Sequence, residues 1–196
     1  MWLVWTSRNL IVHEGKVEEP TSILARAKAM LSVKKNQSQL LKISTITQTF
    51  EIPDWISPPM DWIKINCDGS WNIDSVNGGG GFVIRSHRHQ FVLAEAIYIS
   101  CGSAEEAEIH TIKEAMKKTC ERKDQQVVIE SNVEGIIQKI NRKDFNGNHR
   151  TQILFSDIKY LISRFRKMLF TFVHGTSNGA AHNVALWAKT NQTDMA

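Results

Sequence analysis

The sequence predicts an α/β domain in which an antiparallel meander of three strands leads into a five-stranded mixed sheet flanked by helices. Residues 62–99 contain three apolar segments with strand-type alternation, separated by glycines or polar turn residues. Helical spacing of apolar residues then alternates with two short apolar segments up to residue 190. The hydrophobic content of 42% over 196 residues is enough for a core of ordinary size.

The meander is predicted from period-two alternation and turn residues. In the first segment Ile63, Ile65 and Cys67 share one face, and polar residues occupy the other. Glycines 78–81 precede the second segment, where they are explained equally well by a strand bulge or by close approach of a phosphate. A hairpin turn is expected at 86–90. The predicted strands are 62–68, 82–84 and 91–99.

Helix signals begin after the meander. Ser103, followed three residues later by Glu106, is typical of a capping box and predicts a helix that runs to about residue 122. The remaining elements follow from changes in the apolar period. In chain order they are a strand at 127–131, helices at 133–140 and 151–165, a strand at 168–173 and a helix at 179–190.

Residues 1–60 differ in character from the rest of the chain. Apolar residues at helical spacing predict an amphipathic helix over 21–41. Prolines at 53, 58 and 59 indicate a linker, because proline disfavours both helix and interior strand. We therefore expect an N-terminal helical extension at 1–60, one domain at 61–190 and a short tail at 191–196.

Composition constrains function only weakly. The formal net charge of +4 and the pI near 9.0 are compatible with a polyanionic partner without requiring one. Three cysteines, an odd number without close metal-type pairing, favour a reducing compartment. No apolar run approaches the roughly 20 residues of a membrane span, and residues 1–12 lack a basic leader. We expect a soluble intracellular monomer, nuclear or cytoplasmic, without a membrane partner and with no protein partner identified.

Five short motifs occur in a fixed order between Trp62 and Lys189. They lie at 62–70, 78–85, 107–116, 128–131 and 178–185. Together they resemble the ribonuclease H type 1 superfamily, in the branch associated with plant non-LTR retroelement reverse transcriptases. The resemblance covers about two-thirds of the chain and implies a ribonuclease H-like fold. Residues 5–9 also resemble the segment that precedes this domain in such elements, which implies that residues 1–60 are a retroelement remnant.

The resemblance assigns four residues to the acidic positions of active members, namely Asp68, Glu108, Asn132 and His182. It implies hydrolysis of the RNA strand of an RNA–DNA hybrid by two Mg²⁺ ions, with Mn²⁺ as the other candidate. Asp68 would bridge both ions, and Glu108 would hold one ion near the scissile phosphate. The implied metal ligands are Asp68, Glu108 and Asn132.

This sequence departs from the active pattern at several positions. Asn132 offers an amide oxygen without charge, and an imidazole at His182 is a poorer magnesium ligand than a carboxylate. Glu130 shares the strand face of Asn132 but lies roughly 6–7 Å back along the strand. His174 corresponds to the mobile-loop histidine that would shuttle protons. Residues 175–176 read Gly-Thr where the plant branch has Arg-Glu.

Each candidate residue also has an ordinary structural interpretation. Asp68-Gly-Ser is a common turn sequence after a strand, and a glutamate such as Glu108 usually lies on the solvated face of a helix. Asn132 can serve as the N-cap of the following helix. His182 can simply be a surface residue. Only the combination of these positions predicts a site.

Three functions therefore compete. The first is a metal-dependent ribonuclease acting on RNA–DNA hybrids. The second is a catalytically impaired domain that still binds nucleic acid. The third is a retroelement-derived protein-interaction domain, or a relic, in which the fold survives without the chemistry. The missing charge at Asn132 favours the second and third over the first.

Overall fold

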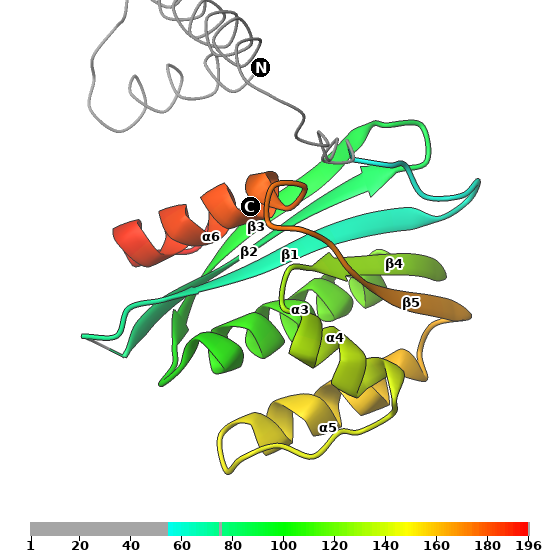
Figure 1. The fold of residues 1–196 in the computed structure, drawn as a ribbon. Helices are drawn as coiled ribbons and strands as arrows, with labels where there is room; N and C mark the ends of the chain where they lie inside the picture. The colour runs from blue at the N-terminus through cyan, green and yellow to red at the C-terminus, as the bar shows by residue number, and fades with distance from the viewer. Residues whose placement is uncertain (1–54, 75, 196) are drawn as a thin grey trace, which may run out of the picture. The chain divides into compact units, whose positions relative to one another are not determined.

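The computed structural model describes residues 55–74 and 76–195 (Figure 1). The predicted helix at 21–41 and the motif at 5–9 lie outside these residues. Within the described part of the chain, no helix is both long and apolar enough to cross a membrane. The fold below is therefore that of the predicted domain and the few residues that precede it.

The five-stranded mixed sheet is confirmed. Its strand order is β3-β2-β1-β4-β5, in which β1, β2 and β3 pair antiparallel and β4 pairs parallel with both β1 and β5. The strands are β1 (Ile63–Trp71), β2 (Asn77–Ser86), β3 (Phe91–Ser100), β4 (Gln126–Ser131) and β5 (Lys167–Phe172). The meander thus supplies one half of the sheet, and helical crossovers supply the other.

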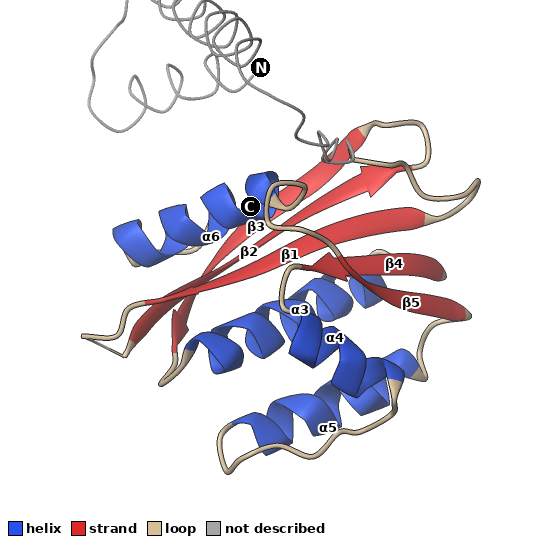
Figure 2. Cartoon of the chain, in the orientation of Figure 1, coloured by secondary structure: helices blue, strands red, loops and turns tan. Residues whose placement is uncertain are grey.

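Among the described residues, four helices cover the two faces of the sheet (Figures 1 and 2). They are α3 (Ala104–Glu121), α4 (Glu134–Asn141), α5 (Thr151–Ile162) and α6 (Gly179–Asn191). The helices α3, α4 and α5 lie on one face, and α6 lies on the other. The predicted capping box begins α3, since the Ser103 Oγ accepts a hydrogen bond from the Glu106 backbone N–H at 3.1 Å.

The main core lies between β1, β2 and β4 on one side and the helices α3, α4 and α5 on the other. The predicted alternation of β1 explains it: Ile65 and Cys67 face α3 and are fully buried. On α3, Ile109, Ile112 and Met116 meet them at helical spacing. The other face of β1 is left for polar residues and for α6.

The glycine run at 78–81 is a regular part of β2, and α6 packs directly on it. A Cβ at Gly81 would lie 2.3 Å from the Ala185 nitrogen and 2.6 Å from the Ala181 carbonyl oxygen. A Cβ at Gly79 would lie 2.3 Å from the Ala185 carbonyl oxygen. These glycines therefore let a helix approach the sheet closely. The only register shift between β2 and β3 lies at Ile84/Arg85, away from the glycines.

A buried polar network lies at the beginning of β1, on the face of the sheet opposite the main core. Lys64 and Glu130 form an ion pair between side chains that are 9% and 8% exposed. The Asn66 Nδ2 donates to Glu130 at 2.9 Å, and the Trp55 Nε1 donates to the Asn66 Oδ1 at 3.0 Å. The Lys64 Nζ also donates to the Ile56 carbonyl at 2.7 Å. Residues 55 and 56, which precede the predicted domain boundary, thus contact the sheet.

Candidate active site

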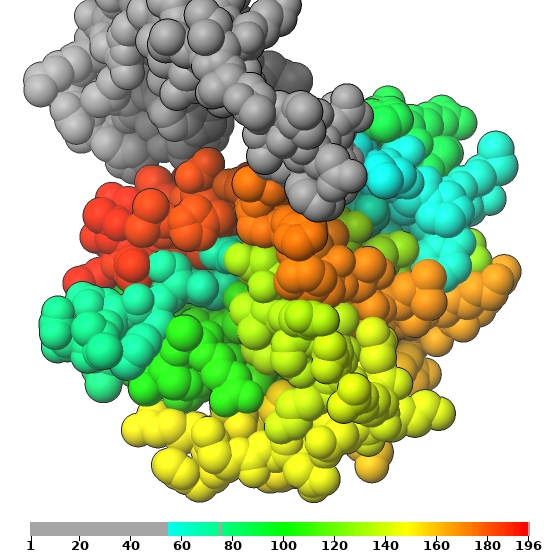
Figure 3. All heavy atoms as spheres, viewed as in Figure 1, coloured from blue at the N-terminus to red at the C-terminus, as the bar shows by residue number. Residues whose placement is uncertain are grey.

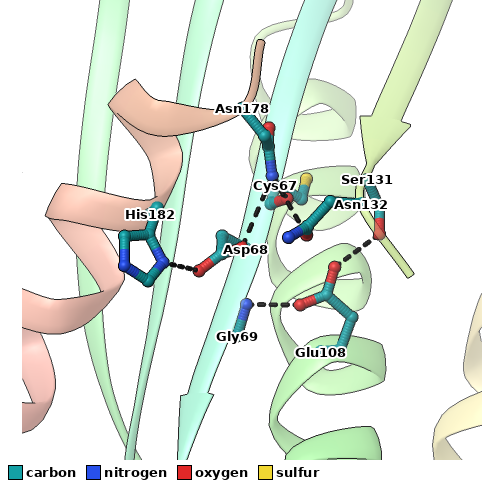
Figure 4. Close-up of polar contacts among 8 residues, drawn as sticks. All are labelled: Cys67, Asp68, Gly69, Glu108, Ser131, Asn132, Asn178 and His182. Carbon is teal, nitrogen blue, oxygen red and sulfur yellow. Dashed lines mark hydrogen bonds and ion pairs between the residues drawn. The ribbon is translucent and has the colours of Figure 1, made fainter. Parts of the chain in front are cut away.

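The candidate site lies where the pairing between β1 and β4 ends. The last pair of that ladder is Asn66 with Glu130, whereas β1 continues beside β2 to Trp71. Asp68 follows on the β1 face that α6 covers, while α3 approaches from the other face of the sheet (Figure 4). Side chains from β1, α3, the end of β4 and the start of α6 therefore meet at one place.

Asp68 is held by two side chains from α6 and its N-cap. Its Oδ2 lies 3.1 Å from the Nδ1 of His182, and its Oδ1 lies 3.5 Å from the Nδ2 of Asn178. Burial raises the pKa of the Asp68 carboxyl, and the hydrogen bond with His182 opposes that rise. Asp68 is therefore an oriented, largely desolvated carboxyl group next to a histidine.

Glu108 is also buried, and both of its oxygens accept hydrogen bonds. The Ser131 Oγ donates to its Oε1 at 2.5 Å, and the Gly69 backbone N–H donates to its Oε2. Gly69 permits this approach, because a Cβ there would lie 2.4 Å from the Glu108 nitrogen. Burial raises the pKa of Glu108 to about 8, and the nearby charge of Asp68 also raises it.

Asn132 follows β4 and faces Asp68, but it does not cap the next helix. The N-cap of α4 is Val133, and no side chain accepts a capping hydrogen bond there. The expectation that Asn132 serves as an N-cap was wrong, because its Oδ1 instead accepts from the Asn178 Nδ2 at 3.3 Å. The Ser131 Oγ accepts the Val133 N–H at 3.0 Å in its place.

The two candidate histidines occupy different surroundings. The His182 side chain is 56% exposed, and one ring nitrogen faces Asp68. His174 lies after β5, and its ring packs edge-on against Phe172 with centroids 5.4 Å apart. Among the described residues, no hydrogen bond or ion pair joins the His174 side chain to Asp68, Glu108 or Asn132. The structure brings residues 68, 108, 132 and 182 together. His174 makes no polar contact with the first three of them.

The loop after β5 nevertheless borders the site. A Cβ at Gly175 would lie 3.7 Å from the Nδ2 of Asn132. In the space-filling view, the orange atoms of this segment lie against the yellow-green atoms that follow β4 (Figure 3). Residues 174–176, which are exposed and contain no lysine or arginine, thus border the site.

The donor set of the site is only half acidic. Within residues 55–74 and 76–195, no group of three or more His, Cys, Asp or Glu side chains is arranged to hold a metal ion. Glu130 does not complete the set, because Lys64 and Asn66 bind its two oxygens. The site as it stands offers one histidine–carboxylate pair, one buried acid and two amides.

Two contributors were not assigned a role from the sequence, namely Ser131 and Asn178. Ser131 directly precedes Asn132, so its side chain points to the α3 face, where it meets Glu108. Asn178 lies four residues before His182, one helical turn away on the same side of α6. That i, i+4 spacing was visible in the sequence and is the signal that could have identified Asn178.

Several solved structures have the same fold as this domain, at low sequence identity. The N-terminal RNase H domain of Rv2228c from Mycobacterium tuberculosis has a TM-score of 0.60 and 16% identity, covering 66% of this chain and 94% of its own. RNase H1 from Halobacterium salinarum has a TM-score of 0.60 and 14% identity, covering 67% and 99%. LC11-RNase H1 from compost, solved with an RNA/DNA hybrid, has a TM-score of 0.61 and 18% identity, covering 66% and 98%.

A larger protein contains the same fold. The foamy viral protease-reverse transcriptase, in complex with an RNA/DNA hybrid, has a TM-score of 0.56 and 16% identity, covering 76% of this chain and 23% of its own. No curated protein sequence matches the chain. The family described as reverse transcriptase-like matches residues 66–188, which are more than half of the chain and include every residue of the site described above. This chain belongs to the reverse transcriptase-like family.

Proposed function

We propose that the domain binds nucleic acid, an RNA–DNA hybrid or RNA, at the Asp68 site, and that it hydrolyses this ligand weakly or not at all. The ribonuclease H-like fold supports binding, since two of the similar structures contain an RNA/DNA hybrid. The family match to reverse transcriptase-like proteins supports the same ligand class. The domain is therefore a nucleic-acid-binding module with impaired catalysis.

The neutral amide at residue 132 is the observation that carries the second half of this proposal. A two-ion magnesium centre needs clustered carboxylates to offset the charge of the ions. Here the four positions supply only Asp68 and Glu108 as acids. The residues present therefore do not fit a pair of Mg²⁺ ions.

The size of the deficit follows from Coulomb's law. A unit charge pair at about 4 Å is worth on the order of 4 kcal/mol, gross, at an effective dielectric of about 20. Each 1.4 kcal/mol is about a tenfold change in an equilibrium constant, and the ion carries two charges, so one missing carboxylate weakens ion binding by roughly three orders of magnitude or more. Imidazole in place of a second carboxylate, at His182, adds to the loss.

Restoring the charge tests the proposal. The purified protein and Asn132→Asp are compared for cleavage of a labelled RNA–DNA hybrid in Mg²⁺ and in Mn²⁺. Asn183→Asp is the matched control, because Asn183 is exposed on α6 and adds the same charge outside the site. We expect negligible cleavage by the wild type and by Asn183→Asp, and measurable cleavage by Asn132→Asp. Wild-type cleavage at the rate of an active ribonuclease H would refute the proposal.

Binding is measured separately from cleavage. Fluorescence anisotropy with the hybrid, with single-stranded RNA and with duplex DNA should detect affinity that falls steeply as salt rises, because phosphate contacts release counterions. Binding without cleavage supports the proposed function. Failure to bind any of the three would favour the other candidate, a retroelement-derived protein-interaction domain or relic.

We further propose that the chain derives from a retroelement reverse transcriptase of the plant branch. The order of its five motifs supports this descent, and the family match is consistent with it. The implied cofactor of that ancestor, Mg²⁺ or Mn²⁺, would have been held at Asp68, Glu108 and residue 132. An aspartate at position 132 in related copies of this sequence in the same genome would support loss of the site after duplication.

A further inference from the structure

Strand β3 is the longer of the two outer strands of the sheet. It has ten residues, whereas β5, at the other edge, has six. An outer strand leaves backbone N–H and C=O groups unpaired, and these groups can pair with a strand of another molecule. Strand β5 begins with Lys167, and the Asn141 Nδ2 donates to its Phe170 carbonyl at 3.0 Å. Strand β3 carries no lysine or arginine.

The composition of β3 favours pairing with another strand. Glu95 is its only charged residue, and the remaining residues are mostly β-branched, aromatic or small and apolar. The Glu95 carboxylate is already bound on the α3 side, where its Oε2 lies 2.9 Å from the Lys118 Nζ. Charged side chains are what usually prevent edge strands from associating. The side chains of β3 therefore do not prevent a strand of like sequence from joining its outer edge.

The segment that follows α6 covers the middle of this edge. Helix α6 is closed by Gln192 in a left-handed conformation (φ 50°), and the chain then returns to the sheet. The Ala96 N–H donates to the Met195 carbonyl at 2.7 Å, and the Met195 N–H donates to the Ala96 carbonyl at 2.9 Å. The Tyr98 N–H donates to the Asp194 Oδ1 at 2.7 Å. Two residues of this segment thus occupy three backbone groups of β3.

The edge continues beyond these contacts. Alternate residues of a strand direct their N–H groups to the same side, so the Ala94 N–H points outward like those of Ala96 and Tyr98. Among the described residues, no backbone group outside the sheet bonds to Ala94. An antiparallel strand seated at Ala94 would run directly into the place that Met195 occupies.

We propose that the outer edge of β3 is a pairing surface for β3 of a second copy of this chain, and that residues 194–195 keep the protein monomeric by occupying it. Antiparallel pairing of two β3 edges about a two-fold axis gives each copy the same contacts. The second copy and Met195 need the same N–H and C=O groups of Ala96, so they exclude each other. This inference goes beyond the proposed function, because it concerns self-association and holds whether or not nucleic acid binds.

The test frees the edge in the full chain. The double variant Asp194→Ala/Met195→Pro removes the carboxylate that accepts from Tyr98 and the N–H that donates to Ala96. Size-exclusion chromatography with light scattering, over a range of protein concentrations, measures the mass. The wild type should stay monomeric, and the double variant should reach about twice the monomer mass as concentration rises. Thr193→Ala is the matched control, because it changes the same segment without removing a bond to β3, and it should behave as the wild type.

Hydrogen exchange and a third substitution locate the interface. At low concentration the Ala96 and Tyr98 amides should exchange several-fold faster in the double variant than in the wild type, and they should slow again as the dimer forms. Adding Ala94→Pro removes an outward N–H without breaking a bond to β2, since an edge strand tolerates proline where its N–H faces away from the sheet. The triple variant should remain monomeric.

Three outcomes would overturn the inference. They are a double variant that remains monomeric at every concentration, a dimer that persists after Ala94→Pro is added, and a wild type that dimerises as readily as the double variant. Met195→Pro alone, which removes a single donor, replaces the double variant if that variant does not fold. The same three outcomes then decide.

Discussion

The contact between α6 and the glycine run of β2 yields a quantitative prediction for Gly81→Ala. The new Cβ would lie 2.3 Å from the Ala185 nitrogen, whereas ordinary contact begins at 3.4 Å. Helix α6 must therefore move away from the sheet by about 1.1 Å, which is the difference between these two distances. The clashing atoms belong to the backbone, so a rotamer change cannot relieve them.

This movement would also disrupt the site. The His182 Nδ1 lies 3.1 Å from the Asp68 Oδ2, so a shift of about 1 Å exceeds the usual hydrogen-bond distance. Overpacking typically costs about 1–3 kcal/mol, and each lost hydrogen bond costs about 1 kcal/mol more. We expect Gly81→Ala to lower the free energy of unfolding by roughly 2–4 kcal/mol.

Urea denaturation monitored by circular dichroism measures the effect, with Gly135→Ala as the matched control. A Cβ at Gly135, in helix α4, meets nothing within 4 Å. The control should be as stable as the wild type or more stable by up to about 1 kcal/mol, because alanine favours helix over glycine. If Gly81→Ala and Gly135→Ala unfold at the same urea concentration, α6 does not pack as closely on β2 as described.

Two further predictions concern buried charges. Because burial raises the pKa of Glu108 to about 8, the folded protein holds a proton that the unfolded chain releases near 4.5; stability should therefore fall as pH rises from about 5 to about 8 and then level off. The urea midpoint should fall over this pH range in the wild type and fall less in Glu108→Gln. An equal dependence of the midpoint on pH in both proteins would contradict the raised pKa of Glu108. Lys64→Met leaves Glu130 buried without its cation and should cost about 3–5 kcal/mol. The double variant Lys64→Met/Glu130→Met should cost clearly less in the same assay, and additive losses would exclude the pairing.

Most of the fold could be predicted because apolar periodicity records which side of each element is buried. The capping box at Ser103 even fixed where α3 begins. Helix α5 ends at Ile162, earlier than predicted, because the chain closes a turn in which the Ser163 N–H donates to Tyr160 and the Arg164 N–H to Leu161. Strand β2 begins earlier than predicted, at Asn77, since glycines carry no side-chain signal for a strand.

The positions of the site could be predicted, but its hydrogen bonding could not. The places of Asp68 and Glu108 follow from the order of elements and from the family resemblance, although β1 was predicted to end at Asp68 and instead continues to Trp71. The partners of each oxygen depend on distances of a few tenths of an ångström between separate elements. Nothing local in the sequence indicates that Asn178 turns its NH₂ group to Cys67 instead of capping α6. Nor does it indicate that Glu130 binds Lys64 across two strands.

The side chains of the site meet where β1 continues beyond its last pairing with β4. Because β1 runs on after its last pairing with β4, at Asn66, a carboxyl from the α3 layer can reach the edge where Asp68 faces the α6 layer. A β4 longer by one residue pair would close that gap in the sheet and keep the Glu108 carboxyl, which is already buried, on the α3 side. A shorter one would admit water to Ser131 and Asn178. Changes of length at this strand end would therefore alter the chemistry of the site as much as changes in its side chains.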